Sequence, residues 1–162
     1  MTGKLDAALG RLAAELTNGT PQAGGFVLNK SDPGLFASLD KLSADAASAR
    51  HDDAPSVASH VAHLRDSLSI MNRWAAGEDP WSSANWADPW KKTQVSDADW
   101  LQLRSELRRE AETWQQNMRS GRELNEVELT GTISSIVHLA YHLGAIRQID
   151  RSIRGPSASG SL

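Results

Sequence analysis

The stretch ISSIVHLAYHLGAIRQI, residues 133–149, predicts one long apolar helix that carries His138 and His142. An α-helix turns by about 100° per residue, so side chains four positions apart lie one above the other on the same face. The helix is apolar on nearly every side around these histidines, which predicts a central place in the fold. The two imidazoles therefore either have structural hydrogen-bond partners or point together at a bound group.

A second pair of histidines, His60 and His63, occurs in SHVAHL at 59–64. The three-residue spacing puts both on the apolar face of a second predicted helix, together with Ser67 and Met71. Burying four imidazoles requires partners for all of their nitrogen atoms. A shared metal ion satisfies several nitrogens at once, whereas the alternative is a set of hydrogen-bonded core histidines.

The composition is that of one ordinary soluble domain. The chain has 162 residues, 40% hydrophobic and 23% charged, with a formal net charge of −3. It has no lysine- or arginine-rich run, so we expect no nucleic acid or membrane partner. It also lacks a membrane-spanning apolar run and a signal peptide, which predicts a cytoplasmic protein. Because the chain has no cysteine, any metal ligands must be His, Asp or Glu, and any thiol must come from a small molecule.

The hydrophobic periodicity predicts an all-α fold, a four-helix bundle in residues 1–155 followed by a flexible tail at 156–162. The four long helices are expected at 3–17, 56–77, 97–121 and 132–154, with one or two short helical pieces at 35–50. Ser43, Ser56 and Ser96 are the predicted N-caps, the last with Asp99 in a capping box, and a first turn that contains Pro55 is the alternative start of the second long helix. The long connections at 18–55 and 78–95 indicate that at least one of them crosses the bundle.

The favoured metal ligands are His63, His138 and His142. Three histidines leave coordination positions open, as in catalytic sites. Neutral imidazole suits zinc, nickel, iron(II) or copper. His60 is a candidate fourth ligand, hydrogen-bond partner or proton shuttle. Tyr141, which we expect on the histidine face, is a candidate hydrogen-bond donor near the metal, or simply a core residue.

The connection at 78–95 is rich in tryptophan and predicts an ordered loop. Trp81, Trp86 and Trp90 have two interpretations. They either fix the loop to the end of the bundle by aromatic packing, or they form a wall over the open metal position. Stacking residues in such a wall would fit a bulky or aromatic substrate.

SVASHVAHLRDSLSIMNRW at 56–74 followed by HLAYHLGAIRQI at 138–149 resembles the DinB/YfiT-like superfamily. AHL at 62–64 is similar to that family's first ligand motif, and HLAYHLGAIRQ to its second. The resemblance covers the helix order of essentially the whole chain. It implies a four-helix bundle with a metal held by His63, His138 and His142. Characterised relatives use a low-molecular-weight thiol, among them mycothiol-dependent maleylpyruvate isomerase and bacillithiol-dependent transferases.

We therefore expect a metal-dependent enzyme, with zinc, nickel or iron, that acts as a thiol-dependent S-transferase or isomerase on a small-molecule substrate. A metal-water hydrolase and a metal- or ligand-binding protein without turnover are the alternatives. The apolar helix faces also predict a homodimer.

Overall fold

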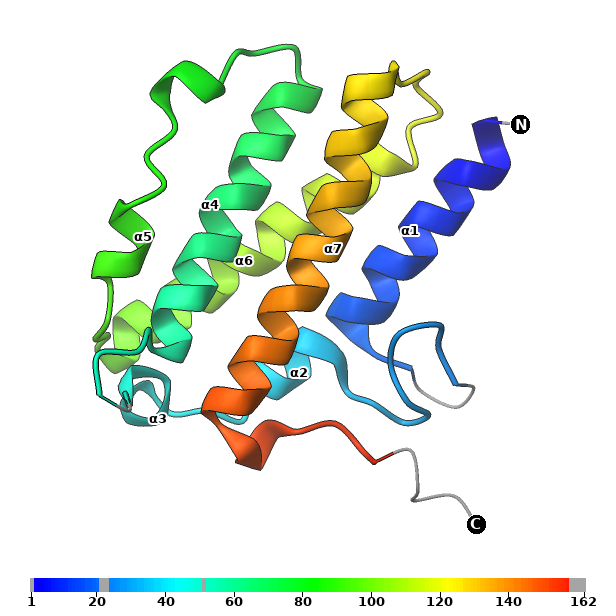
Figure 1. Cartoon of the computed structure of the whole chain (residues 1–162). Helices are drawn as coiled ribbons and strands as arrows, with labels where there is room; N and C mark the ends of the chain where they lie inside the picture. Colours follow the sequence, from blue (N-terminus) through cyan, green and yellow to red (C-terminus); the bar gives the residue numbers. More distant parts are fainter. Residues whose placement is uncertain (1, 21–23, 51, 158–162) are drawn as a thin grey trace.

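Every regular element is helical in residues 2–20, 24–50 and 52–157, which are the residues that the computed structural model describes. This confirms the predicted all-α class. Four helices are long and the other elements are short (Figure 1). The long helices are α1 (Thr2–Asn18), α4 (Val57–Ala75), α6 (Asp97–Met118) and α7 (Glu126–Ile149). The short elements are α2 (Gly34–Leu39), α3 (Ala44–Ser48), α5 (Asp88–Lys91) and the 3₁₀ turns η1 (Trp81–Ser83) and η2 (Arg151–Ile153).

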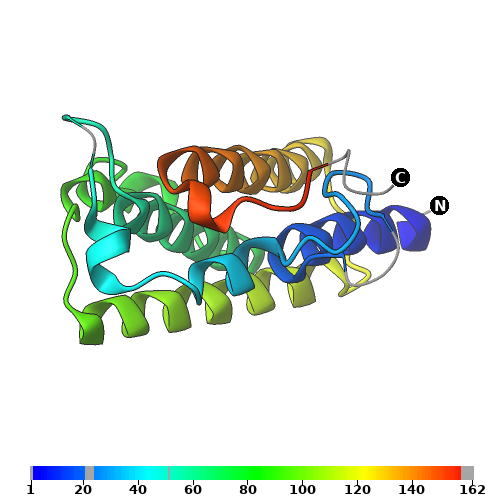
Figure 2. The same ribbon diagram turned by 90° about the horizontal axis from the view of Figure 1, so that it is seen from below.

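The four long helices enclose the hydrophobic core. α4 packs against α6 and α7, and α1 packs against the same two helices. Viewed from below, α6 and α7 lie on opposite sides, with α4 and α1 between them (Figure 2). Each long helix contributes a side chain that is at most 1% exposed: Leu16, Leu64, Leu107 and Ile146. Burying one such side chain stabilises the fold by roughly 1.5–3 kcal/mol, so this interior is the main source of stability.

Side-chain caps define where several helices begin. The hydroxyl of Ser43 accepts a hydrogen bond from the backbone N–H of Ala46, and Ser56 accepts one from Ser59. Ser96 and Asp99 form a reciprocal capping box at the start of α6. All three predicted N-caps are confirmed. Such caps satisfy backbone N–H groups that the first turn of a helix leaves without partners.

The start of α7 differs from the prediction, which placed it at Thr132. Asn125 accepts from the backbone N–H of Glu128, and Glu128 accepts from that of Asn125, so the helix begins at Glu126. The sequence contains this Asn-x-x-Glu capping pattern. The prediction missed it because the surrounding segment is polar and was interpreted as a connection. The predicted end at 154 was also too late, because Asp150 interrupts the helix and caps η2.

The tryptophan-rich segment 78–95 contains η1 and α5, where the sequence predicted only an ordered loop. It lies beside α4, and α5 packs directly on that helix (Figure 1). Ser59 of α4 donates a hydrogen bond to the carbonyl of Lys92 at 3.0 Å. Ser48 accepts one from the backbone N–H of Val95 at 3.0 Å. These contacts hold the end of the segment against α3 and the start of α4.

The connection after α1 is attached to the end of α7 by a buried ion pair. Asp32 accepts from both terminal nitrogens of Arg147, at 2.9 and 2.6 Å. Asp32 is 3% exposed and Arg147 12% at their side chains. Because removing one partner would leave a buried charge without compensation, this pair fixes the end of α7 relative to the connection.

The end of the chain was predicted to be a flexible tail at 156–162. The carbonyl of Pro156 accepts a hydrogen bond from Asn29 at 2.8 Å, and residues 158–162 lie outside the described residues.

The outward face of α7 exposes Ile133, Val137 and Tyr141. The homodimer stays a prediction. No helix in the described ranges is both long and apolar enough to cross a membrane.

Substituting Asn125→Ala should lower the free energy of unfolding by about 1 kcal/mol, because the capping box that starts α7 is lost. Thermal unfolding followed by circular dichroism measures this effect. Gln148→Ala, at an exposed position of the same helix, is the matched control and should leave the midpoint nearly unchanged. Equal midpoints for the two variants would show that the cap does not stabilise α7.

Candidate metal centre

Three histidines from two helices point their ring nitrogens at one another. His63 comes from the middle of α4, and His138 and His142 lie one turn apart on α7. The Nε2 atom of His138 lies 3.0 Å from that of His63 and 2.9 Å from that of His142. The three residues each offer a ligand atom within 4.8 Å of the others, so they can hold a metal ion.

The hydrogen-bond chemistry of this cluster fits a cation better than a set of core histidines. A neutral imidazole has one N–H and one ring-nitrogen lone pair. His138 therefore faces two neighbours with a single Nε2 atom, and one hydrogen or one lone pair must serve both of them. A metal ion at the common point would accept all three lone pairs and remove this conflict. Three imidazole ligands also leave positions open for water or substrate.

His60 lies beside this group and contacts His142. The two Nδ1 atoms are 2.7 Å apart. If the Nε2 atom of His142 uses its lone pair toward the common point, its Nδ1 carries the hydrogen and donates it to His60. A ligand histidine is commonly oriented by such a bond from its other nitrogen. Of the three roles predicted for His60, the geometry supports the hydrogen-bond partner.

His63 is oriented differently, by stacking. Its Nδ1 atom is buried and has no hydrogen-bond partner among the described residues. Its ring lies nearly parallel to that of Trp90, with centroids 4.6 Å apart and an interplanar angle of 28°. Trp90 also meets His60 edge-on at 5.2 Å. Trp90 thus holds two of the four imidazoles from the side of the tryptophan-rich segment.

Burial keeps the cluster uncharged at neutral pH. His60, His63 and His142 are buried, and His138 is half-buried. Loss of hydration, together with a smaller repulsion from neighbouring histidines, lowers the pKa of His63 to about 4 and that of His142 to about 3. Burial also lowers the pKa values of His60 and His138. Neutral imidazole is the form that binds metals, so the lone pairs are available without a proton being removed.

The other predicted site residues lie around this centre. Trp86 is tilted toward His63, with ring centroids 6.4 Å apart, and Trp81 meets Trp74 edge-on at 5.4 Å. Tyr141 was expected on the histidine face. It meets the ring of His142 edge-on at 5.1 Å, but it is 69% exposed and makes no hydrogen bond with a described histidine.

A cleft of about 360 Å³ borders the centre, and we name it the tryptophan cleft. Its lining residues come from α4, η1 and the following turn, and α7, and they include His138. They are Ser67, Ile70, Met71, Trp81, Trp86, Gly131, Ser134, Ser135 and His138. The sequence prediction singled out only Trp81, Trp86 and His138 as site residues. Helical spacing from His63 and His138 places the others on the same faces, toward the C-terminus of α4 and the N-terminus of α7.

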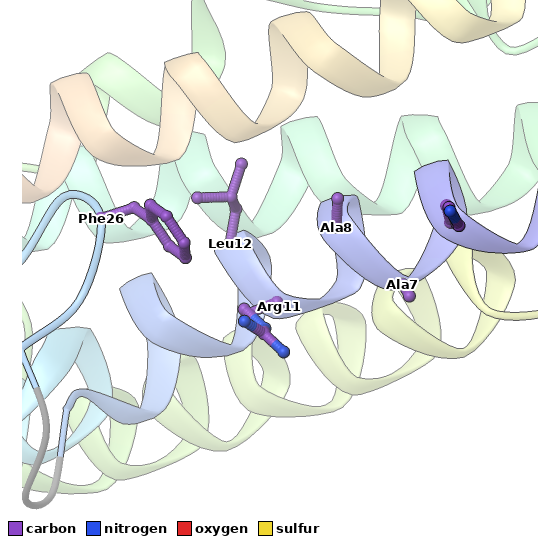
Figure 3. Close-up of a pocket in the computed structure, with 6 residues that line it drawn as sticks. Ala7, Ala8, Arg11, Leu12 and Phe26 are labelled. Atoms are coloured by element: carbon purple, nitrogen blue, oxygen red, sulfur yellow. The ribbon is translucent and has the colours of Figure 1, made fainter.

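A second hollow, of about 510 Å³, lies on α1 and contains no candidate ligand. Phe26 reaches from the loop toward Leu12 of α1 (Figure 3). The other lining residues are small or basic: Ala7, Ala8, Lys4 and Arg11. This α1 hollow is lined by none of the four histidines.

No protein-family model, curated protein or solved structure matches the chain. The centre is therefore interpreted from its own geometry.

The stability of the metal-free protein should fall as the pH is lowered from 7.5 to 5.5. The folded-state pKa values of His63 and His142 lie below the ordinary 6.5, so the unfolded chain binds more protons in this range. Most carboxylates stay ionised there. Urea unfolding at a series of pH values, in the presence of a chelator, measures how steeply the free energy of unfolding depends on pH. His142→Phe should show a shallower dependence than the wild type, and equal slopes would contradict buried neutral histidines.

The purified protein, without a histidine tag, should contain close to one divalent transition metal ion per chain, measured by elemental mass spectrometry. His142→Ala should lose it, because one of three ligands is gone. His60→Ala should keep the site with an affinity lower by about 10–100-fold, measured by chelator competition. Gln148→Ala is the matched control. A wild-type protein that takes up no metal on reconstitution would show that the four histidines are structural.

Proposed function

We propose that the chain is a cytoplasmic metal-dependent enzyme of the DinB/YfiT-like type, a four-helix bundle with long crossover connections. The proposal rests on one observation, the convergence of three Nε2 atoms from α4 and α7 beside a cleft. The reaction is a thiol-dependent transfer or isomerisation. The proposed metal is zinc, nickel or iron, because the donor set is entirely imidazole.

A bound divalent metal ion would supply positive charge that lowers the pKa of a thiol or polarises a carbonyl group. The chain's own residues do the rest. His63, His138 and His142 would hold the ion, His60 would orient His142 through the contact between their Nδ1 atoms, and Trp90 stacks on His63.

The charge of the donor set favours an anionic reactant. Among the described residues, the ligand group contains no carboxylate, so nothing in it neutralises a divalent cation. A buried positive charge is costly unless it is paired. A thiolate from a small molecule would supply the missing negative charge. Because the chain has no cysteine, that thiol has to be a cosubstrate.

A thiol should change the electronic absorption spectrum of the cobalt(II)-substituted protein. The probe is N-acetylcysteine, and N-acetylserine is the control because it differs only in the oxygen that replaces sulfur. We expect N-acetylcysteine to produce a new near-ultraviolet band and N-acetylserine to leave the spectrum unchanged. In His142→Ala, N-acetylcysteine should not produce this band. An unchanged spectrum at saturating thiol would contradict the thiol-dependent reaction. Ester or amide hydrolysis without any thiol would identify a hydrolase instead.

A further inference from the structure

We propose that the tryptophan cleft binds an uncharged aromatic group of the substrate. This inference rests on the proposed function in one respect, because it takes the group in the cleft to be part of the molecule that reacts at the histidine centre. The cleft shares His138 with that centre. A ligand in the cleft would therefore lie beside one of the three candidate metal ligands.

The lining of the cleft excludes a charged group. Its described lining residues include no lysine, arginine, aspartate or glutamate, and His138 is the only ionisable residue among them. Ile70, Met71 and the two indoles of Trp81 and Trp86 make most of its surface apolar. A carboxylate or ammonium group placed there would lose hydration without gaining a partner, which is strongly unfavourable. An uncharged group loses little hydration and gains contacts.

The hydroxyl groups in the cleft are mostly engaged within the protein. Ser67 donates to the carbonyl of His63 at 2.7 Å, and Ser135 donates to that of Thr132 at 2.8 Å. Ser134 is exposed and has no intramolecular hydrogen bond among the described residues. The cleft thus offers a single uncommitted hydroxyl, which suits a ligand with one neutral polar substituent.

Two exposed tryptophans give the cleft flat, polarisable walls. Trp81 and Trp86 are 46% and 47% exposed. Large aromatic side chains are usually more buried than this in a monomer, and exposed indoles stack favourably on aromatic ligands. The volume of about 360 Å³ is at the lower end of the range for small-molecule sites. An aromatic group of one or two rings fits these properties.

The wall formed by Trp81 depends on a close approach of two helices. A Cβ atom on Gly131 of α7 would lie 2.6 Å from Cζ3 of Trp74 on α4. Trp74 in turn supports Trp81 through an edge-on contact at 5.4 Å. The absence of a side chain at Gly131 therefore lets Trp74 take the position from which it supports the wall.

The α1 hollow gives an internal contrast. Lys4 and Arg11 line it beside Phe26, so an aromatic acid would find positive charge there and none in the tryptophan cleft. The charge of a ligand should therefore decide which of the two sites it prefers.

Equilibrium dialysis with matched naphthalene probes tests the inference on the metal-free protein, because a zinc ion held beside His138 would itself attract a carboxylate. 2-Naphthylmethanol is the neutral aromatic probe, and 2-naphthoate has the same rings with a carboxylate. We expect the alcohol to bind at least tenfold more tightly than the acid. Acid that binds in the α1 hollow is measured as the part of the binding that Arg11→Ala removes, and it is subtracted first. Equal or tighter binding of the acid at the cleft would overturn the inference.

Two pairs of variants locate the bound probe. Ser134→Phe fills the cleft, and Ser105→Phe makes the same change on an exposed position of α6. Trp86→Ala removes one wall, and Phe26→Ala removes an exposed aromatic outside the cleft. We expect at least tenfold weaker binding of the alcohol in Ser134→Phe and Trp86→Ala, with little change in the two controls. If Ser134→Phe fails to fold, the comparison of Trp86→Ala with Phe26→Ala still shows whether the alcohol binds in the tryptophan cleft.

The two proposals fail in distinguishable ways. If the alcohol binds in the cleft and the protein takes up no metal, the cleft is a site for neutral aromatic groups, and the proposed function fails together with the identification of that group as part of its substrate. If the protein takes up metal and the alcohol binds no better than the acid, the proposed function stands and the cleft inference fails. If all four variants bind the alcohol like the wild type, the probe lies elsewhere and the cleft inference is wrong.

Discussion

The candidate site depends on the packing of four imidazole rings between α4 and α7, of which His60, His63 and His142 are buried and His138 is half-buried. Each ring has two nitrogen atoms that need partners once water is excluded. His142 satisfies one nitrogen through His60, and three Nε2 atoms are left facing a common point. Burial also keeps these rings neutral, so no charge repulsion separates the helices. The same constraint explains why a metal ion would stabilise the packing of α4 on α7.

The surrounding elements position this cluster from several sides. The capping box at Asn125 sets the start of α7, and the pair between Asp32 and Arg147 fixes its end. The hydrogen bond from Ser59 to Lys92 holds the tryptophan-rich segment against α4, where Trp90 stacks on His63. Each contact is local, but together they set the distance between histidines that are 75 or more positions apart in sequence.

On the proposed function, the metal centre and the tryptophan cleft would differ in the charge of the groups that they bind. A divalent ion held by neutral ligands favours an anionic group, whereas the cleft beside it favours an uncharged one. On the proposals made above, the substrate would place a neutral aromatic part in the cleft and meet an anionic reactant at the metal ion. The two requirements are independent, since one comes from α4 and α7 ligands and the other from the indoles of Trp81 and Trp86.

The sequence by itself determined the long helices, the caps at Ser56 and Ser96, and the two histidine pairs, because helical spacing and capping are local properties. It also contained the Asn125 signal that the prediction missed. Only the tertiary structure decided that His63 meets the α7 pair, that His60 turns its Nδ1 to His142, and that Tyr141 faces outward. Tyr141 lies about 60° from His138 around the helix axis, at the edge of the predicted face. Whether a residue at that edge is buried or exposed depends on how the neighbouring helices pack, and the hydrophobic periodicity of one helix does not contain this information.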